Sequence, residues 1–414
     1  MNFLRALGLL SFGLFAAMLA AAADEDGTQF FEQGSRYFFG SDHTLADPRL
    51  GAYYFRRAAE AGHVRGQYNF GACCEHGWGV KASRQLAYKW YSRAGASGLP
   101  EAELARARLL AMGVPAEHTD AEDFPEIPAD VPAALKVMRQ LAASGFGPAA
   151  FELAKRLCAE LPRQPEYGAE IRSLAQTAAA RMPESPEALL LLATVYQNGI
   201  GGSYDMPKAF RLLERASEHS AEAKARLAEA LEYGHGCEID AEKSLRLDLE
   251  AAEAQVPRAC LRVGRRCLYG HGVPVDYDRA FSCFQQAFAA AYPGSAEALG
   301  NCYRDGIGVA RDVEQAATIY QLGANAGDAE SQYELACCYR DGIGLERNAE
   351  TAAYWFSQAA ERHHAAAQRC LALALISGDG VPRNPAKAAE LLQQAARAGD
   401  RQAAEILRAN QLEF

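Results

Sequence analysis

The sequence lacks the short motifs that mark the common classes of enzyme. It contains no GxSxG or SxxK nucleophile motif, no HExxH zinc motif and no Walker phosphate loop. None of its eleven cysteines belongs to a CxxC pair, so neither a zinc ribbon nor a thioredoxin-type redox site is indicated. The sequence therefore predicts no catalytic residue, no metal and no cofactor, although a catalytic group dispersed along the chain stays open.

The sequence also lacks an excess of basic charge and has one long apolar run. Its 42 Lys and Arg face 52 Asp and Glu, a net charge of −10, which disfavours a nucleic-acid partner. Residues 1–23 have Arg5 near their start, an apolar centre and small residues before Asp24. This layout predicts a cleaved signal peptide, an exported chain in the periplasm or outside the cell, and no stable membrane span after cleavage. The alternative is an uncleaved anchor.

Glycine is plentiful, and its spacing predicts the fold. Two glycines flanking one residue recur along the chain, at a period of 36 from Gly234 onward, and the heptapeptide CYRDGIG occurs twice at the same period, over 302–308 and 338–344. The pairs begin at Gly77, Gly199, Gly234, Gly270, Gly306, Gly342 and Gly378. A fixed period in the thirties is typical of helical repeats. We predict an all-α, right-handed superhelical solenoid of about ten antiparallel two-helix repeats.

Helix-capping residues occur at fixed places in each repeat. The first glycine of each pair fits a left-handed C-terminal cap of a first helix. A good N-cap residue follows six positions later, before the second helix. These residues are Ser83, Asp205, Asp240, Asp276, Asp312, Asn348 and Asn384. Each unit is therefore expected to be a helix, a short turn and a second helix.

The repeats are not equally regular along the chain. Residues 24–182 are expected to hold irregular repeats, with an acidic insertion over 116–130 that we interpret as a solvated loop. The unit over 146–182 lacks the glycine pair. Residues 183–400 hold regular repeats of about 36 residues, and residues 401–414 are expected to form a closing helix, because the end of a solenoid needs a cap.

The repeat pattern resembles a known family. Segments such as ALGNCYRDGIGVARDVEQAATIYQLGANAG (298–327) and YNFGACCEHGWGV (68–80) strongly resemble the Sel-1-like repeat family, which is related to the tetratricopeptide repeat. The resemblance covers nearly all of the chain after the signal segment and implies a protein–protein interaction scaffold. Two alternatives are a hydrolase acting on a cell-envelope substrate, since β-lactamases have been described in the family, and a binder of glycan or peptidoglycan fragments.

Four arginines form a positively charged group in a chain of negative net charge, and they are the candidate partner-binding residues. In repeats of this kind the first helices line a concave groove, and the resemblance places Arg258, Arg265, Arg304 and Arg340 along it. We call these four residues the arginine row. Because guanidinium groups suit carboxylates, the expected partner is a protein or peptide with an acidic or C-terminal carboxylate segment. The alternative is that these arginines offset helix dipoles or pair with local acids.

The cysteines allow one possible disulfide. Cys260 and Cys283 are expected at matching heights on the two helices of one unit, which makes them the best candidates for a bond. Cys302 and Cys338 lie one repeat apart, where equivalent helices pack about 8–10 Å from each other. A disulfide needs α-carbons within about 7 Å, so we expect no bond between these two.

Overall fold

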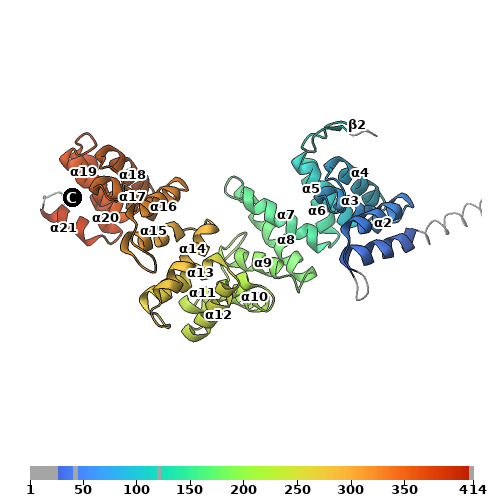
Figure 1. The fold of residues 1–414 in the computed structure, drawn as a ribbon, viewed down its shortest axis with the longest axis horizontal. Coiled ribbons are helices and arrows are strands. Elements are labelled where there is room, and N and C mark those ends of the chain that lie inside the picture. Colours follow the sequence, from blue (N-terminus) through green and yellow to red (C-terminus); the bar gives the residue numbers. More distant parts are fainter. Residues whose placement is uncertain (1–26, 41–44, 119–122, 410–414) are drawn as a thin grey trace, which may run out of the picture. The chain divides into compact units, whose positions relative to one another are not determined.

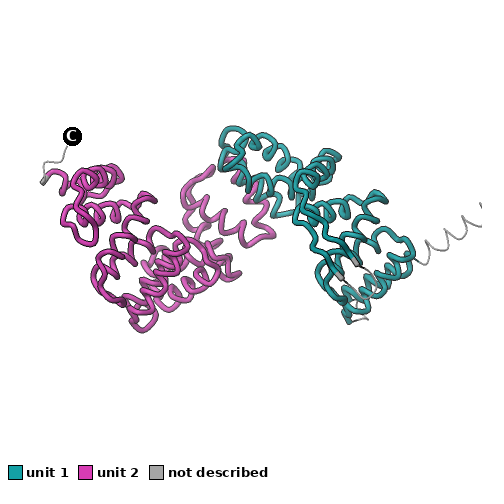
Figure 2. Tube along the Cα trace, turned by 90° about the horizontal axis from the view of Figure 1, so that it is seen from above, with its two compact units in different colours: residues 1–205 teal, residues 206–414 magenta. Residues whose placement is uncertain are grey.

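The structure is a computed structural model that describes residues 27–40, 45–118 and 123–409. The predicted signal peptide and the last five residues lie outside the described residues. The chain divides into two compact units, unit 1 of Met1–Asp205 and unit 2 of Met206–Phe414 (Figure 2). Each unit is built from consecutive helices that pack against their neighbours in the chain (Figure 1).

The described part of unit 1 is helical apart from one small two-stranded sheet. Its described elements, after a helix over residues 27–39, are α2 (Pro48–Glu60), α3 (Val64–His76), α4 (Arg84–Ala96), α5 (Pro100–Met112), β1 (Glu117–His118), β2 (Asp123–Phe124), α6 (Val131–Ala143), α7 (Gly147–Glu160), the short 3₁₀ helix η1 (Pro165–Tyr167), α8 (Gly168–Arg181) and α9 (Pro186–Gln197). In the repeat over residues 146–182, which has no glycine pair, η1 lies where the other repeats have their tight turn.

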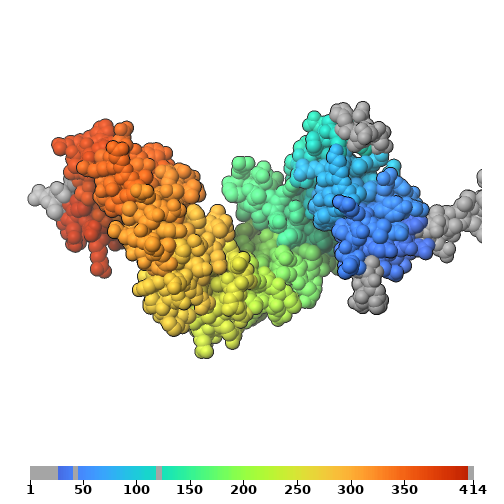
Figure 3. All heavy atoms as spheres, in the orientation of Figure 1, coloured from blue at the N-terminus to red at the C-terminus, as the bar shows by residue number. Residues whose placement is uncertain are grey.

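Unit 2 is helical throughout its described part. Its helices are α10 (Met206–Ser217), α11 (Ala221–Tyr233), α12 (Ala241–Glu253), α13 (Pro257–Tyr269), α14 (Tyr277–Ala289), α15 (Ser295–Asp305), α16 (Val313–Asn325), α17 (Ala329–Asp341), α18 (Ala349–Glu361), α19 (Ala365–Ser377), α20 (Pro385–Arg397) and α21 (Arg401–Ala409). Successive repeats lie side by side in chain order (Figure 3). The predicted all-α repeat architecture is confirmed.

Six of the seven predicted glycine caps and six of the seven predicted N-caps are present in the structure, whereas the C-cap of α9 is Asn198 and not the predicted Gly199. The first glycine after α3, α11, α13, α15, α17 and α19 is left-handed, and its N–H donates back into the helix. The N-cap side chain accepts from the first turn of the second helix at Ser83, Asp240, Asp276, Asp312, Asn348 and Asn384. Local sequence therefore defines the ends of these helices.

The second glycine of a pair has a separate task, which is to let two repeats approach closely. A β-carbon at Gly344, whose φ is +70°, would lie 2.1 Å from the carbonyl oxygen of Val313, at the start of α16 in the preceding repeat. Gly272 is an exception, because its β-carbon would meet only Leu245 Cδ2 at 3.3 Å. The repeats on either side of Gly272 are therefore less tightly apposed at this point.

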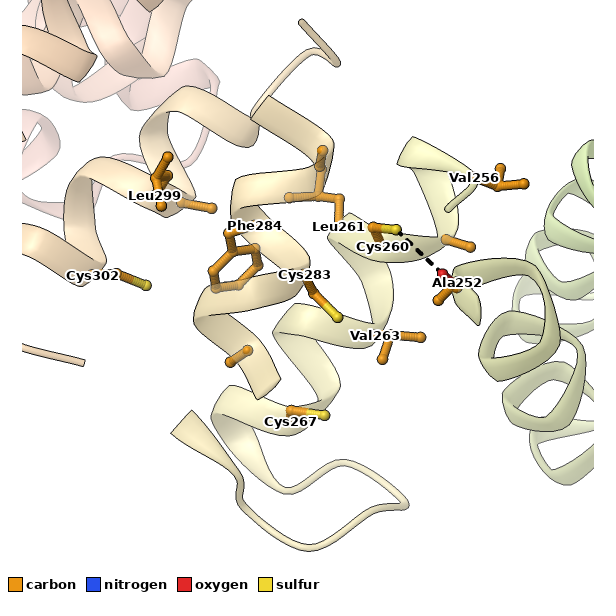
Figure 4. Packing of buried hydrophobic residues seen from close by; sticks show 14 of the residues in the cluster. Ala252, Val256, Cys260, Leu261, Val263, Cys267, Cys283, Phe284, Leu299 and Cys302 are labelled. Carbon is orange, nitrogen blue, oxygen red and sulfur yellow. Dashed lines mark hydrogen bonds between the residues drawn. The ribbon is translucent and has the colours of Figure 1, made fainter. Parts of the chain in front are cut away.

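Cysteine serves as a small apolar residue in the core. Cys260, Cys267 and Cys283 lie in the cluster between α13 and α14 (Figure 4), and all eleven cysteines of the chain are free thiols in the structure. The Cys260 thiol lies 3.3 Å from Gln286 Oε1, and burial raises the pKa of Cys283 to about 11. The structure contains no Cys260–Cys283 bond, and their pairing under oxidising conditions stays the alternative to eleven free thiols.

Most described residues of the acidic insertion are exposed, in agreement with a solvated loop, and the insertion also contains regular structure. Its described part forms a hairpin in which β1 pairs antiparallel with β2 and Val114 bridges to Ile127. The Gln85 side chain of α4 is buried and donates to the carbonyl oxygens of Pro115 (2.7 Å) and Pro125 (2.8 Å). These long-range hydrogen bonds tie the insertion to α4, and no local motif in the sequence indicates them.

Candidate functional site

The arginine row lies on first helices of three consecutive repeats in unit 2. Arg258 and Arg265 belong to α13, Arg304 to α15 and Arg340 to α17. Their side chains keep between 30% and 53% of their area exposed. The row is therefore accessible to a partner, and the contacts that each guanidinium already makes decide what it can still bind.

The two arginines of α13 reach in opposite directions along the repeats. Arg258 Nη1 lies 2.5 Å from Glu229 Oε2 of α11, and its Nε lies 3.8 Å from Glu222. Arg265 Nη2 lies 3.9 Å from Glu297 Oε2 of α15 and has the most exposed side chain of the row. Arg258 is thus held firmly by the preceding repeat, whereas Arg265 makes only a long contact with the following one.

Arg304 is enclosed by polar partners. Its Nε and Nη2 donate to both oxygens of Asp305, and its Nη1 donates to Glu334 Oε2 of α17 (3.0 Å) and to the Tyr320 hydroxyl of α16 (3.3 Å). The Tyr320 hydroxyl in turn donates to Asn301 Oδ1 (2.7 Å). Burial raises the pKa of the Glu334 carboxyl, and the charge of Arg304 opposes that rise.

Arg340 occupies the equivalent position one repeat later but has different partners. Its Nε and Nη2 donate to both oxygens of Asp341 (2.8 and 2.7 Å). Its Nη1 lies 3.7 Å from the Cys370 thiol of α19, and its guanidinium carbon is 5.8 Å from the centre of the Phe356 ring. This guanidinium therefore faces one carboxylate and an otherwise weakly polar surface.

Each arginine of the row contacts the first helix of an adjacent repeat. The row thus links α11, α13, α15, α17 and α19 in turn. The ion pairs agree with the alternative interpretation of the sequence, in which these arginines pair with nearby acids. Binding of a partner by the row is a different matter and stays a prediction.

A buried charge cluster lies next to the row, and its acidic members were missed from the sequence. Asp248 of α12 is fully buried, 3.0 Å from Arg262 Nη2 and 3.7 Å from Arg266 Nε. Glu232 of α11 contacts the same arginines at 2.6 and 3.0 Å. Burial raises the pKa of Asp248 to about 6, against the effect of the two guanidinium groups.

A signal for this cluster exists in the repeat itself. Asp248 stands 36 residues before Phe284, at a position where later repeats have Tyr320 and Phe356. A carboxylate at a position otherwise filled by aromatic rings requires a buried partner, because an isolated buried charge is very costly. Comparison of the repeats by position therefore could have indicated it.

Two further observations limit the chemistry of the described residues. In residues 27–40, 45–118 and 123–409, no three His, Cys, Asp or Glu side chains lie together in a way that could hold a metal ion. Within the same ranges, no helix combines the length and the apolar character needed to cross a membrane.

Comparison with known proteins identifies the repeats. The Sel1 repeat matches this chain at residues 34–63, 64–99, 186–220, 221–255, 257–292, 293–328, 329–364 and 365–400. Residues 100–185, which include the insertion, carry no match. The comparison with curated proteins gives no match.

Solved structures show a similar fold. A crystal structure of c5321, a protective antigen of uropathogenic Escherichia coli with an SLR fold, is 22% identical, with a TM-score of 0.54; the match covers 95% of this chain and 89% of that protein. A Sel1 repeat protein from Oxalobacter formigenes is 26% identical, with a TM-score of 0.51, over 57% of this chain and 94% of that protein. Both are repeat solenoids.

Proposed function

The chain belongs to the Sel1 repeat family, whose members are generally protein-interaction scaffolds, and we propose that it is an exported scaffold that binds a partner protein on the arginine row. Export rests on the signal-like segment of residues 1–23. The observation that carries the binding role is the row itself. It presents partly exposed guanidinium groups from three consecutive repeats of an otherwise acidic chain.

The members of the row are unequal as contacts for a partner. Arg258 and Arg304 are held by acids of adjacent repeats at 2.5 and 3.0 Å, so a partner would have to displace these acids. Arg265 and Arg340 have more exposed side chains, and each makes its contact to the adjacent repeat at a longer distance. An acidic or C-terminal segment would therefore bind mainly through Arg265 and Arg340, since hydrogen bonds between a guanidinium and a carboxylate are strengthened by charge.

Capture experiments with charge-reversed variants test this function. The purified chain, Arg265→Glu/Arg340→Glu and the control Arg279→Glu are each used to capture proteins from an envelope extract, and each captured protein is purified and its affinity is measured. Arg279 is exposed on α14, a second helix, so the control reverses charge away from the row. We expect the double variant to lose its partner and the control to retain it. Equal affinities for the double variant and the unaltered chain would contradict the proposal.

A further inference from the structure

A small cavity lies beside Arg340 in unit 2. It is lined by residues of α17, α18 and α19, the helices labelled in Figure 1, and of the turn after α19. Its volume is about 330 Å³. Apolar side chains form most of its wall, and two charged side chains, Arg340 and Asp379, complete it. The apolar part includes Ala353, Phe356, Leu373 and Ile376.

The preceding repeat explains why this cavity is distinctive. Around Arg304, the equivalent positions carry an amide, a phenol hydroxyl and a carboxylate, and these groups bind one another and the guanidinium. One repeat later all three polar groups are gone while the arginine remains. The replacements are Asn301 by Cys337, Tyr320 by Phe356 and Glu334 by Cys370.

Because Cys370 replaces Glu334, Arg340 keeps its pair with Asp341 but lacks the second carboxylate that Arg304 has. Arg304 Nη1 has a carboxylate oxygen at 3.0 Å, whereas Arg340 Nη1 has a thiol sulfur at 3.7 Å. Burial raises the pKa of Cys370, so this group is a neutral thiol and not a thiolate. A carboxylate from outside the chain can take the place that Glu334 holds in the preceding repeat.

We propose that this cavity binds the C-terminal residue of a partner peptide, with the terminal carboxylate on Arg340 and an apolar side chain against Phe356 and Leu373. This inference rests on the proposed scaffold function and defines one contact of it. The guanidinium supplies a charge-assisted hydrogen bond in a partly dry environment, where such bonds are strong. Leu373 is 41% exposed and Arg340 keeps 42% of its side-chain area exposed, so a ligand can enter beside them.

Size and charge favour a peptide end over a fatty acid. The cavity is at the lower end of the range of about 300–1,000 Å³ that ligand pockets span, which suits one residue and not a long acyl chain. Asp379 lies on its wall, 3.9 Å from Arg347, and its side chain is half exposed. Its carboxylate can accept a hydrogen bond from a peptide N–H, and a fatty acid has no such donor.

Direct binding measurements on the full chain test the site. The probe is a fluorescein-labelled hexapeptide that ends in leucine with a free carboxylate. The protein is added to this peptide up to a millimolar concentration. We expect saturable binding, and at least about tenfold weaker binding both for the same peptide with a C-terminal amide and for one that ends in glycine. Equal binding of the acid and the amide, or no binding of the acid, would overturn the proposal.

Two substitutions at one position provide a matched pair. Cys370→Glu restores the carboxylate of the preceding repeat and should weaken peptide binding at least about tenfold, whereas Cys370→Ser adds no charge and should retain it. Thermal unfolding of both variants verifies that they are folded. Equal affinity of both folded variants would overturn the site, as would displacement of the peptide by decanoate at a lower concentration than by the unlabelled peptide.

The outcomes separate this site from the scaffold function. If captured partners bind Cys370→Glu as tightly as the unaltered chain, the scaffold function stands and the cavity is not their site. If the peptide binds as expected but no partner protein depends on Arg265 or Arg340, the cavity stands as a peptide site and the scaffold proposal fails.

Discussion

Arg304 and Glu334 form an ion pair across the boundary between two repeats, with Nη1 3.0 Å from Oε2. The pair joins α15 to α17, the first helices of two adjacent repeats. Glu334 is largely shielded from water, and its pKa is raised for that reason. Arg304 therefore contributes more to cohesion between repeats than its partly exposed position indicates.

Replacement of Arg304 should destabilise unit 2 more than the same replacement of Arg340. Arg304→Gln leaves the shielded Glu334 carboxylate without its cation, for which we expect a loss of about 2 kcal/mol. Arg340→Gln removes an exposed pair with Asp341 and should cost less than about 1 kcal/mol. Urea denaturation followed by circular dichroism measures both. Equal losses would show that the Arg304–Glu334 pair is no stronger than a surface pair.

Thiol reactivity should follow burial. Burial raises the pKa of Cys73 and Cys74 to about 12, and only thiolates react with Ellman's reagent, so these thiols should stay unreactive at pH 8 in the folded chain. The partly exposed Cys237 should react first. Without reductant, the denatured chain should yield all eleven thiols. A yield two lower, with Cys260 and Cys283 linked in peptide maps, would instead establish the disulfide considered from the sequence.

Gly272 and Gly344, each the second glycine of its turn, provide a matched test of how closely adjacent repeats approach. Alanine at position 272 or 344 would have to adopt a left-handed backbone conformation, which lowers the free energy of unfolding by about 1–2 kcal/mol. Gly344→Ala also forces a methyl group against the Val313 carbonyl, so its total cost should reach about 3 kcal/mol or more. Calorimetric melting of both variants measures the difference. If Gly272→Ala is the more damaging change, the contact with Val313 does not limit that position.

Much of the fold follows from short-range sequence signals. The glycine that caps each first helix and the residue that caps each second helix bind backbone groups only a few residues away. The 36-residue period and the helix ends could therefore be predicted. The partners of Arg258 and Arg304 lie about 30 residues away in other repeats. Which acid a guanidinium meets there depends on how neighbouring helices are rotated, and a single pattern does not specify that.

The insertion and the Arg340 cavity show two further limits of sequence reasoning. Gln85 accounts for the ordered hairpin, yet it reaches Pro125 across 40 residues without any motif that links them. The cavity depends on the combination of Phe356 and Cys370 with a retained arginine, and each residue alone reads as ordinary core. Alignment of adjacent repeats by position reveals such combinations, because the preceding repeat serves as the reference.

Asp248 should make the stability of unit 2 depend on pH in a defined direction. Its pKa is raised by burial to about 6 in the folded chain, against about 4 when unfolded. Because the folded state binds the proton more tightly, protonation of Asp248 should stabilise the fold as the pH falls from 7 toward 4.

The variant Asp248→Asn isolates this effect, since it cannot titrate at that position. The free energy of unfolding of the unaltered chain, minus that of the variant, should rise by up to about 3 kcal/mol between pH 7 and pH 4. Urea denaturation at a series of pH values measures it. If this difference instead decreases as the pH is lowered from 7 to 4, Arg262 and Arg266 outweigh burial and hold Asp248 as a carboxylate. The buried cluster would then act as an ion-pair network that secures the repeats around α12 and α13 at neutral pH.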